Sequence, residues 1–539
     1  MSQTRTRIGG HLVVDSLEAA GAQAVFGVPG IHALAIWDGL ADTSLRYVGM
    51  RTELSAGFAA DGYARAGGKP AVLLTTTGPG SFVATCALME ARTSYVPLVN
   101  IVSQVPRDVI GTNRGFLHEL PTQSQVLSSF AKWHALARGI DEVPDLIAEA
   151  FRQATSAPAG PVVLEIPVDV LEGETDLPAP SAFDVTPIPL PAPDPALLAQ
   201  AAGLLDSAER PVLWAGGGVL RAGGAAAFVA LAERLGAPAA TTYMGKGAIP
   251  ADHPLAVGSA CDEGAFQELL RTADVVLAVG TELGAETTGQ WSLTFEGRLI
   301  QVDARAEHLG ATYEGLGIHG DARAVLEALA PLVSQHESDG PARVRAVHER
   351  ISSGLATQGR AAELHLLADL RDALGRDDIL VCDMTLTGYL AAPFLDVYAP
   401  GTFLYPLGSG TLGYAWPAAI GAKVARPDAQ VLAVHGDGGV LYNVLELLSA
   451  RQHGIGAKLL VVDDGGYGIL RVYQEGAYGR TSKVDLAQPD FPALARSLGV
   501  PVFEASPRAL AGALHEALAV DGPAFIHLPQ TVVYPRVTL

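Results

Sequence analysis

Two carboxylates in the last third of the chain follow apolar segments and stand among glycines. Asp437 lies in VHGDGG after the apolar residues 431–434, and Asp464 follows 27 residues later at the end of AKLLVVDD. Oxygen ligands at the ends of neighbouring parallel strands suit Mg²⁺, which also keeps waters and takes phosphate oxygens. Glycines let backbone amides approach an oxyanion, and a following helix adds partial positive charge. Although Gly-Asp-Gly by itself is usually a turn, this pairing predicts a metal-diphosphate clamp within residues 436–468.

A third carboxylate, Glu53, stands where a strand end passes into a helix in the stretch MRTELSAGFAADGYAR, residues 50–65. A glutamate at a helix start is usually no more than a favourable partner of the helix dipole. Burial among Leu54, Ala56 and Phe58 would raise the pKa of its carboxyl group. Such a group could exchange a proton near neutral pH, as general acid-base catalysis requires.

The segments that must position these carboxylates alternate between short apolar strands and helical patterns. This alternation is typical of parallel sheets covered by helices. Residues 176–195, DLPAPSAFDVTPIPLPAPDP, are dense in proline and indicate a linker. We therefore expect an α/β chain of three doubly wound parallel-sheet domains at residues 1–175, 196–335 and 361–539, with linkers at 176–195 and 336–360.

Composition argues against several classes of partner. The 57 acidic residues outnumber the 36 basic ones and give a net charge of −21, which disfavours nucleic acid and anionic membranes as partners. Three scattered cysteines do not suggest a disulfide framework and favour a reducing compartment. The sequence shows neither a signal-peptide pattern nor an apolar run long enough to span a bilayer. A cytoplasmic enzyme is the expectation.

The motif pair around Asp437 and Asp464 resembles the signature of thiamine diphosphate (ThDP) enzymes. GDGGVLYNVLEL and VDDGGYGIL are similar to the acetolactate synthase-like branch, and FGVPG, GFAADGYAR and TTTGPG resemble its pyrimidine-binding domain. The resemblance covers nearly the whole chain and implies a pyrimidine-binding, a central dinucleotide-binding-like and a diphosphate-binding domain. It also implies that Asp437, Asp464 and the Gly466 carbonyl bind the metal. Glu53 would contact N1′ of ThDP and promote the tautomer that removes the C2 proton.

The resemblance further implies a set of contacts with ThDP. Gly410 would offer its carbonyl to the 4′-amino group, and Leu412 would support the bent form of the cofactor. Asn443 matches an asparagine near the diphosphate, although it could equally cap or turn the chain. The other expected cofactor contacts are Val28, Pro29, Gly78, Leu386, Thr387, Gly388, Gly436, Asp437, Gly438, Gly439, Tyr467, Gly468 and Ile469.

Two further segments carry candidates for substrate chemistry. His118 and Glu119 lie in RGFLHELPTQ, where the resembled 2-oxo acid decarboxylases carry His and acetolactate synthases carry Gln. Both are expected to be catalytic, although a His-Glu pair is often a surface or capping feature. The same loop resembles decarboxylases of 5-guanidino-2-oxopentanoate. Leu470 and Tyr473 are expected to face the substrate, and biosynthetic synthases have Trp at the second of these positions.

The expected central domain departs from FAD-binding relatives. Those proteins carry an Arg-Phe-Asp-Asp-Arg run after the strand ADVVLAVG, where this chain has Glu282 and Glu286 in place of both arginines. Carboxylates would repel the FAD phosphates, so FAD is not expected. GGGVLRAGG in the same domain lacks the full dinucleotide fingerprint, and an NAD-linked dehydrogenase would rest on it alone.

The resemblance predicts ThDP- and Mg²⁺-dependent decarboxylation of a small-molecule 2-oxo acid through an enamine, which is released as an aldehyde or ligated to a second carbonyl. Acetolactate synthase proper, a pyruvate carboligase, is the alternative, and a non-catalytic ThDP-fold binding protein is a weaker one. In the family the pyrimidine domain of one subunit meets the diphosphate domain of another. We therefore expect a homodimer or homotetramer with active sites between subunits.

Overall fold

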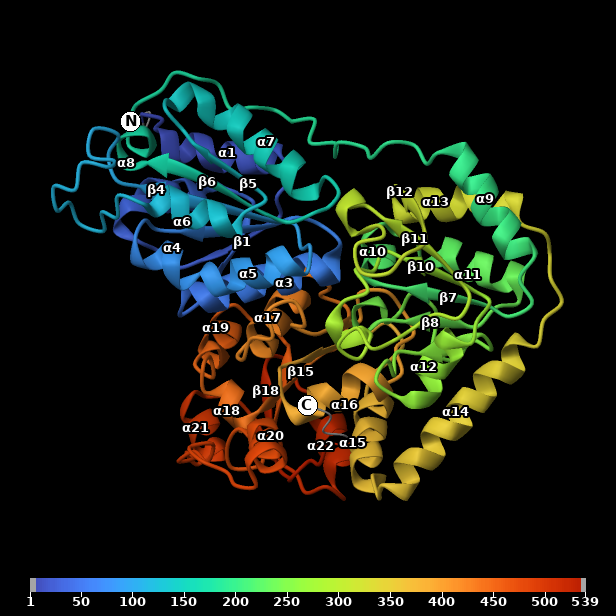
Figure 1. The fold of residues 1–539 in the computed structure, drawn as a ribbon. Coiled ribbons are helices and arrows are strands. Elements are labelled where there is room, and N and C mark those ends of the chain that lie inside the picture. Colours follow the sequence, from blue (N-terminus) through green and yellow to red (C-terminus); the bar gives the residue numbers. More distant parts are fainter. Residues whose placement is uncertain (1–5, 535–539) are drawn as a thin grey trace.

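The computed structural model describes residues 6–534 and contains three six-stranded sheets, each surrounded by helices (Figure 1). Neighbouring strands are parallel in all three, which confirms the predicted α/β class with three doubly wound sheets. Residues 1–5 and 535–539, at the outer ends of the first and last expected domains, lie outside the described residues. Within the described part of the chain, no helix has both the length and the apolar character needed to cross a bilayer.

The N-terminal sheet has the strand order β2-β1-β3-β4-β6-β5. The order reverses between β1 and β3, so the chain segments that leave these two strands diverge and open a crevice at their carboxyl ends. Its strands are β1 (Ala24–Gly27), β2 (Arg46–Gly49), β3 (Ala71–Thr75), β4 (Leu98–Gln104), β5 (Trp133–Leu136) and β6 (Pro161–Pro167). Its helical segments are α1 (Gly9–Ala19), η1 (Ile31–Ala33), α2 (Leu34–Gly39), η2 (Leu40–Asp42), α3 (Glu53–Gly67), α4 (Pro79–Val83), α5 (Thr85–Thr93), α6 (Gln123–Phe130), η3 (Ile140–Glu142), α7 (Val143–Thr155) and α8 (Val168–Leu171).

The central sheet has the order β12-β11-β10-β7-β8-β9 and reverses between β7 and β10. The proline-rich segment between α8 and α9 carries no regular element and runs over to this domain (Figure 1). The strands are β7 (Pro211–Ala215), β8 (Ala239–Thr241), β9 (Ala256–Gly258), β10 (Val275–Val279), β11 (Arg298–Asp303) and β12 (Leu316–His319). The main helices are α9 (Pro195–Asp206), α10 (Gly217–Arg221), α11 (Ala225–Leu235), α12 (Gly264–Arg271) and α13 (Ala322–Leu329).

The C-terminal sheet has the order β14-β13-β15-β16-β18-β17, with its reversal between β13 and β15. The strands are β13 (Ile379–Cys382), β14 (Phe403–Leu404), β15 (Val431–Gly436), β16 (Lys458–Asp463), β17 (Val502–Glu504) and β18 (Ala524–Pro529). The helices are α15 (Ala361–Asp372), α16 (Leu386–Phe394), α17 (Ala415–Ala425), α18 (Asp437–Val440), α19 (Glu446–Gln452), α20 (Gly468–Tyr478), α21 (Phe491–Ser497) and α22 (Leu510–Leu518).

The second expected linker, residues 336–360, is largely helical. It contains α14 (Gly340–Thr357), an 18-residue helix that runs along the outside from the central to the C-terminal domain (Figure 1). Val344 and Val347 of this helix are buried in a core that the two domains share. The polar composition of the segment concealed this helix because only a narrow apolar face is needed to hold it against its neighbours. We keep the five predicted segments as a proposed division of the chain.

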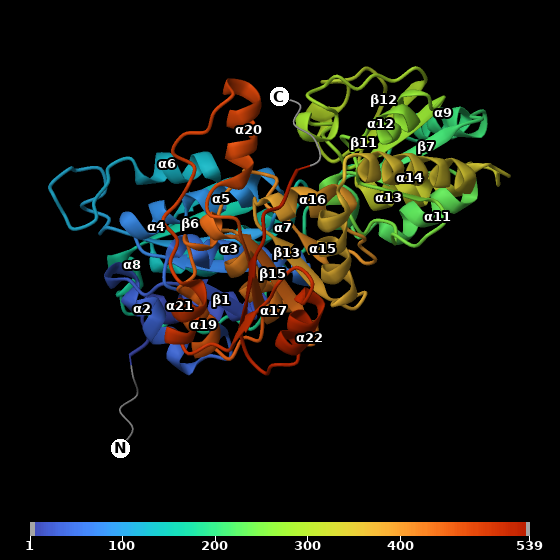
Figure 2. The ribbon, with the colours of Figure 1, turned by 90° about the horizontal axis from the view of Figure 1, so that it is seen from below.

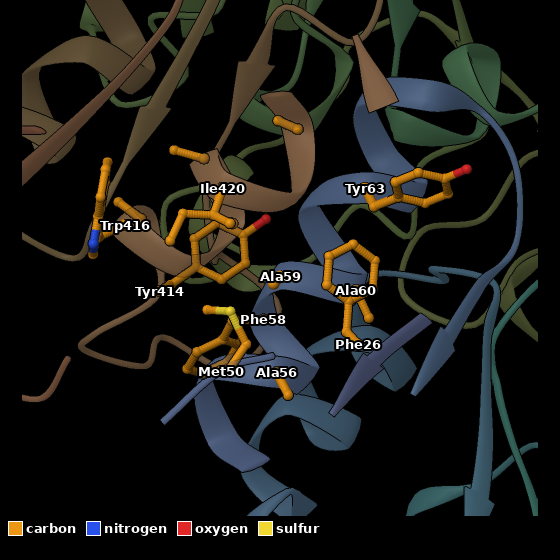
Figure 3. Packing of buried hydrophobic residues seen from close by; sticks show 14 of the residues in the cluster. Phe26, Met50, Ala56, Phe58, Ala59, Ala60, Tyr63, Tyr414, Trp416 and Ile420 are labelled. Atoms are coloured by element: carbon orange, nitrogen blue, oxygen red, sulfur yellow. The ribbon is translucent and has the colours of Figure 1, made fainter. Parts of the chain in front are cut away.

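Helices α3 and α17 join the N-terminal and C-terminal domains at a close helix contact. A Cβ atom on Gly421 of α17 would overlap the carbonyl oxygen of Ala59, and one on Gly62 of α3 would overlap that of Ala418. Figure 3 shows Phe58 of α3 close to Tyr414, with Ile420 nearby, and the Phe58 and Tyr414 rings meet edge to face at 5.5 Å. These residues belong to one buried core that extends through both domains.

A buried ionic network lies beside this helix contact. Arg65 Nε lies 2.6 Å from Asp61 Oδ1, and Arg65 Nη2 lies 2.7 Å from Glu90 Oε1. The Tyr414 hydroxyl donates to Asp61 at 2.7 Å, and the Ser409 N–H donates to Glu90 at 2.7 Å. Both carboxylates are fully buried, so their charge is tolerated only because these donors surround it. The network therefore ties the loop around Ser409 to α3 and α5.

The helix contact yields a prediction for a matched pair of Gly→Ala substitutions. Gly421→Ala should lower the free energy of unfolding by about 3 kcal/mol, because the new methyl group forces α3 and α17 apart. Gly512→Ala in α22, where the space around the glycine is open, should raise it by up to ~1 kcal/mol through helix propensity. Urea denaturation of both variants measures the difference. Equal effects of the two substitutions would contradict the described contact.

Candidate functional site

The strands that carry the two predicted metal-binding carboxylates end side by side. In the register of β15 and β16, Gly436 is opposite Val462, so Asp437 and Asp464 both follow these strands at the same edge of the sheet. This edge is also where the strand order reverses, the position at which open α/β sheets bind ligands. Helix α18 begins directly at Asp437. The predicted adjacency of the two strand ends is confirmed.

A cavity of about 200 Å³ opens at this edge, between β13, β15, β16 and the loop before α17. Its lining residues in the described structure all come from the C-terminal domain. Of the residues predicted from sequence, the structure brings together around it Leu386, Thr387, Gly410, Leu412, Gly436, Asp437, Gly438, Gly439, Asp464, Gly466, Tyr467, Gly468, Ile469 and Leu470.

Three residues predicted for this half of the site lie behind or beside the cavity. Gly388 packs against the backbone carbonyl of Asp383, where a side chain would not fit. The Asn443 amide donates to the Gly413 carbonyl and so braces the loop that carries Gly410 and Leu412. Tyr473 is half-buried on α20, which stands out from the C-terminal domain in Figure 2.

The carboxylates in the cavity suit a cation. Asp437 is buried, its Oδ2 accepts from the Gln488 amide, and its Oδ1 has no hydrogen-bond partner. Burial, and then the neighbouring carboxylates of Asp464 and Asp463, raise the pKa of Asp437 to about 6. A divalent cation would relieve this repulsion and use the free oxygen. The described residues hold no group of three His, Cys, Asp or Glu side chains suited to a metal, so backbone, water or phosphate oxygens would have to complete the coordination.

The cavity also suits a phosphate group. The side chain of Thr387 in the first turn of α16 is fully buried, and its hydroxyl has no hydrogen-bond partner. The first N–H groups of a helix have no partner within the helix and favour an anion. A diphosphate that bound here and shared a cation with Asp437 and Asp464 would accept hydrogen bonds from the Thr387 hydroxyl and from the first N–H groups of α16. The shared cation would neutralise the two carboxylates.

Asp383 is a central residue of the site that was not predicted from the sequence. This fully buried carboxylate follows β13 and accepts from the N–H groups of Gly413 at 3.1 Å and Tyr414 at 2.8 Å. His435 Nε2 accepts from the Trp416 N–H at 2.8 Å, so the ring proton of His435 is on Nδ1. This Nδ1 atom lies 3.0 Å from the Asp383 carboxylate, in an ion-pair contact that lacks hydrogen-bond geometry. Asp383 thus fixes the loop of Gly410 and Leu412 relative to β15.

Two residues that contact the paired carboxylates were also missed. Gln488 binds Asp437 from a loop 51 residues later in the chain. Arg471 on α20 donates to the Asp464 carbonyl at 2.9 Å and to Asp485 at 2.8 Å. Neither residue stands in a motif, and only the tertiary fold brings them to the site.

The N-terminal domain carries a second group of predicted residues at its own sheet reversal. Val28 and Pro29 follow β1, Gly78 follows β3, and Glu53 begins α3 after β2. Glu53 Oε1 lies next to Gly80, where an added Cβ atom would be 3.0 Å from it. The carboxyl group is only half-buried in one chain, in contrast to the burial that its apolar neighbours suggested. Glu53 therefore stays partly accessible in the single chain.

His118 and Glu119 lie in a loop that projects from the N-terminal domain before α6 (Figure 2). The Glu119 carboxylate accepts from the backbone N–H groups of Asn113 at 2.6 Å, Gly115 at 2.9 Å and Phe116 at 3.1 Å. These contacts give Glu119 a role in shaping the loop. His118 packs directly against Gly78, where an added Cβ atom would lie 2.8 Å from the His118 Cβ.

The central domain carries the two acidic residues Glu282 and Glu286 in the segment that follows β10. Glu282 and Glu286 line a cavity between β10 and the N-terminal domain, and Glu282 accepts from the Tyr95 hydroxyl. Where the strand order of this sheet reverses, the Gly218 N–H donates to the Gly280 carbonyl at 2.9 Å. This hydrogen bond joins the segments that follow β7 and β10. The glycine-rich turn after β7 is thus engaged in backbone contacts.

Comparisons with known proteins agree with this arrangement. Models of the thiamine pyrophosphate (ThDP) enzyme family match residues 7–126 (N-terminal TPP binding domain), 198–329 (central domain) and 383–528 (C-terminal TPP binding domain). A probable 2-ketoarginine decarboxylase of Pseudomonas aeruginosa is 36% identical over 93% of this chain and 90% of its own. A probable acetolactate synthase large subunit of Methanocaldococcus jannaschii is 32% identical over 96% and 90%.

The isozyme 1 large subunit of acetolactate synthase from Escherichia coli is 30% identical over 99% of this chain and 97% of its own. These three relatives match between 93% and 99% of this chain. The chain is therefore an enzyme of the thiamine pyrophosphate family and belongs to its acetolactate synthase-like branch.

Proposed function

We propose that this enzyme decarboxylates a 2-oxo acid with ThDP and Mg²⁺ and releases the product as an aldehyde or ligates it to a second carbonyl. The observation that carries the proposal is the pair of carboxylates Asp437 and Asp464 at adjoining strand ends, with a free oxygen on the buried Asp437 and the unpartnered Thr387 hydroxyl in the same cavity. The names of the relatives, a 2-ketoarginine decarboxylase and acetolactate synthases, support this class of reaction.

Different residues of the chain would contact different parts of the cofactor. Asp437, Asp464 and the Gly466 carbonyl would bind Mg²⁺, and Thr387 with the start of α16 would bind the diphosphate. When bound, ThDP supplies a carbon nucleophile and an electron sink for the bond that breaks. Leu412 would hold the cofactor in shape, and the Gly410 carbonyl would accept from its amino group. Asp383 keeps both of these residues in place through the N–H groups of the same loop.

Glu53 would complete the site from a second copy of the chain. The residues that line the C-terminal cavity all belong to one domain, whereas Glu53 lies on the face of another and stays half-exposed. Large apolar side chains are exposed near both groups, which a second subunit would cover: Ile31, Leu34, Val83, Met89, Leu441, Tyr442 and Leu445. A homodimer is the smallest assembly that pairs the two groups, and a homotetramer contains two such pairs.

Release of aldehyde is the outcome that we favour over the synthase reaction. His118 offers a proton donor at the predicted substrate side, and Tyr473 stands where the biosynthetic synthases have Trp. Glu282 and Glu286 leave the central domain unsuited to the phosphates of FAD, so we propose a flavin-free enzyme. Acetolactate synthase proper stays the alternative, because several synthases are about as similar to this chain as the decarboxylase is.

A panel of 2-oxo acids tests the proposed reaction. The purified enzyme with ThDP and Mg²⁺ should release CO2 from at least one acid, with 5-guanidino-2-oxopentanoate and pyruvate as the first two to compare. Chelation of the metal should stop the reaction, and added Mg²⁺ should restore it, because Asp437 and Asp464 alone cannot hold a diphosphate. Aldehyde as the main product supports the decarboxylase, and acetolactate from pyruvate supports the alternative. No ThDP-dependent CO2 release from any acid would refute the proposal.

Glu53→Gln tests the proton exchange at the pyrimidine side. The variant should retain ThDP, because the diphosphate and metal contacts are untouched, but lose at least ~100-fold in turnover. Glu119→Gln is the control, since that carboxylate binds loop N–H groups and should affect turnover less. Steady-state CO2 release and equilibrium dialysis of ThDP measure the two properties. Turnover of Glu53→Gln within a few fold of the unmutated enzyme would rule out this role.

A further inference from the structure

A second histidine lies beside His118 on the N-terminal face of the site. His32, on η1 just after β1, is 7% exposed, and its ring centre is 5.1 Å from that of His118 and 5.8 Å from that of Phe116. The Nδ1 atoms of both histidines are buried and have no hydrogen-bond partner. Two imidazoles with buried, unpartnered nitrogens thus face each other in one place.

A histidine that serves only to stabilise the core would have a partner for its buried nitrogen. An unpaired buried nitrogen costs free energy. The other two histidines in the described part of the chain with a buried nitrogen that makes no hydrogen bond each face a carboxylate: His435 Nδ1 lies 3.0 Å from Asp383, and His308 Nδ1 lies 3.5 Å from Asp303. His32 has a nitrogen with no such partner, which is typical of a group that awaits a ligand or a proton.

The histidine pair adjoins the predicted position of Glu53. The turn after β3 and the start of α4 lie beside His118 and Glu53: an added Cβ atom on Gly78 would touch His118, and one on Gly80 would touch Glu53. The residue before η1, Gly30, packs against Thr76 in the same turn. His118 itself has a left-handed backbone with φ of 67°, which a non-glycine residue adopts only when its surroundings hold it. The loop therefore places the pair on the face that carries Glu53.

Other charges around His32 are engaged elsewhere. Of the elements packed against η1, β4 carries no charged side chain, Asp38 of α2 pairs with His11, and Asp169 of α8 pairs with Arg107. Burial, and then the nearby His118, lower the pKa of His32. Two cations at this distance in a buried site would repel each other, so the pair can hold one proton but disfavours two.

We propose that His32 and His118 act as a unit that holds one proton and delivers it to the carbon from which CO2 has left. The proposal rests on the proposed decarboxylation, whose balance is RCOCOO⁻ + H⁺ → RCHO + CO2. CO2 leaves without the bonding electrons, the proton of the pair forms the C–H bond with those electrons, and water returns a proton to the pair. The pair thus favours aldehyde over ligation to a second carbonyl.

His32→Phe, His118→Phe and the double variant test the proposal in the full-length enzyme with ThDP and Mg²⁺. Each single variant should release the first CO2 per site at a rate within a few fold of the unmutated enzyme. Aldehyde release should then be at least ~10-fold slower, because the general acid is lost. With an added acceptor aldehyde, the ratio of ligated product to free aldehyde should rise. The double variant should be no slower than the slower single one, as expected for residues that act as a unit.

A second readout needs no cofactor. The unfolded chain binds a proton on His32 below pH ~6.5, whereas in the folded chain the pKa of His32 is lowered and the proton binds only at lower pH. Stability should therefore fall as the pH drops through about 6.5, and His32→Phe should remove part of this fall. His515→Phe, at an exposed histidine on α22, is the control and should leave the pH dependence unchanged.

The outcomes separate the two proposals. If the unmutated enzyme releases no CO2 from any 2-oxo acid, the proposed function fails and the inference fails with it. If it does release CO2 but His32→Phe leaves the aldehyde-to-CO2 and ligation ratios unchanged, or if the two single effects multiply in the double variant, only the role of His32 is overturned.

Discussion

The close contact between α3 and α17 is the constraint on which both groups of site residues depend. Gly62 and Gly421 let the two helix backbones come into contact, and this contact fixes the N-terminal ends of α3 and α17. Glu53 is the first residue of α3, and Tyr414 stands just before α17, where its N–H is bound by Asp383. One helix contact thus sets the positions of the proton-exchanging carboxylate and of the loop that carries Gly410 and Leu412.

Buried polar groups reinforce this contact and give it a defined geometry. Arg65 bridges the fully buried carboxylates of Asp61 and Glu90, and Glu90 also accepts from the Ser409 N–H in the loop between β14 and α17. Removing any one partner would leave a buried charge exposed to a low-dielectric interior, which is costly. The C-terminal domain therefore shares one core and the polar network with the N-terminal domain and another core with the central domain, so the three sheets are not independent units.

Local sequence patterns predicted the parallel sheets, and the family resemblance predicted most of the cavity lining. Asp437, Asp464 and the surrounding glycines follow strands directly, and the register of a parallel pair leaves little choice about where they meet. Asp383, Gln488, Arg471 and His32 could not be predicted in the same way, because their roles come from contacts between segments far apart in the chain. Helix α14 was not predicted because its composition is polar. The partial exposure of Glu53 was not predicted either, because apolar neighbours in the sequence do not guarantee that a residue is buried.

The central claim is that each active site joins the metal-diphosphate residues of one chain with Glu53 of another. Mixing two inactive variants, Glu53→Gln and Asp437→Asn, after denaturation and refolding together tests it most directly. In a mixed dimer one site carries both substitutions and the other carries neither, so about a quarter of all sites should be intact. Recovery of about that fraction of CO2 release is the predicted result. A mixture that stays as inactive as its two components would contradict the account.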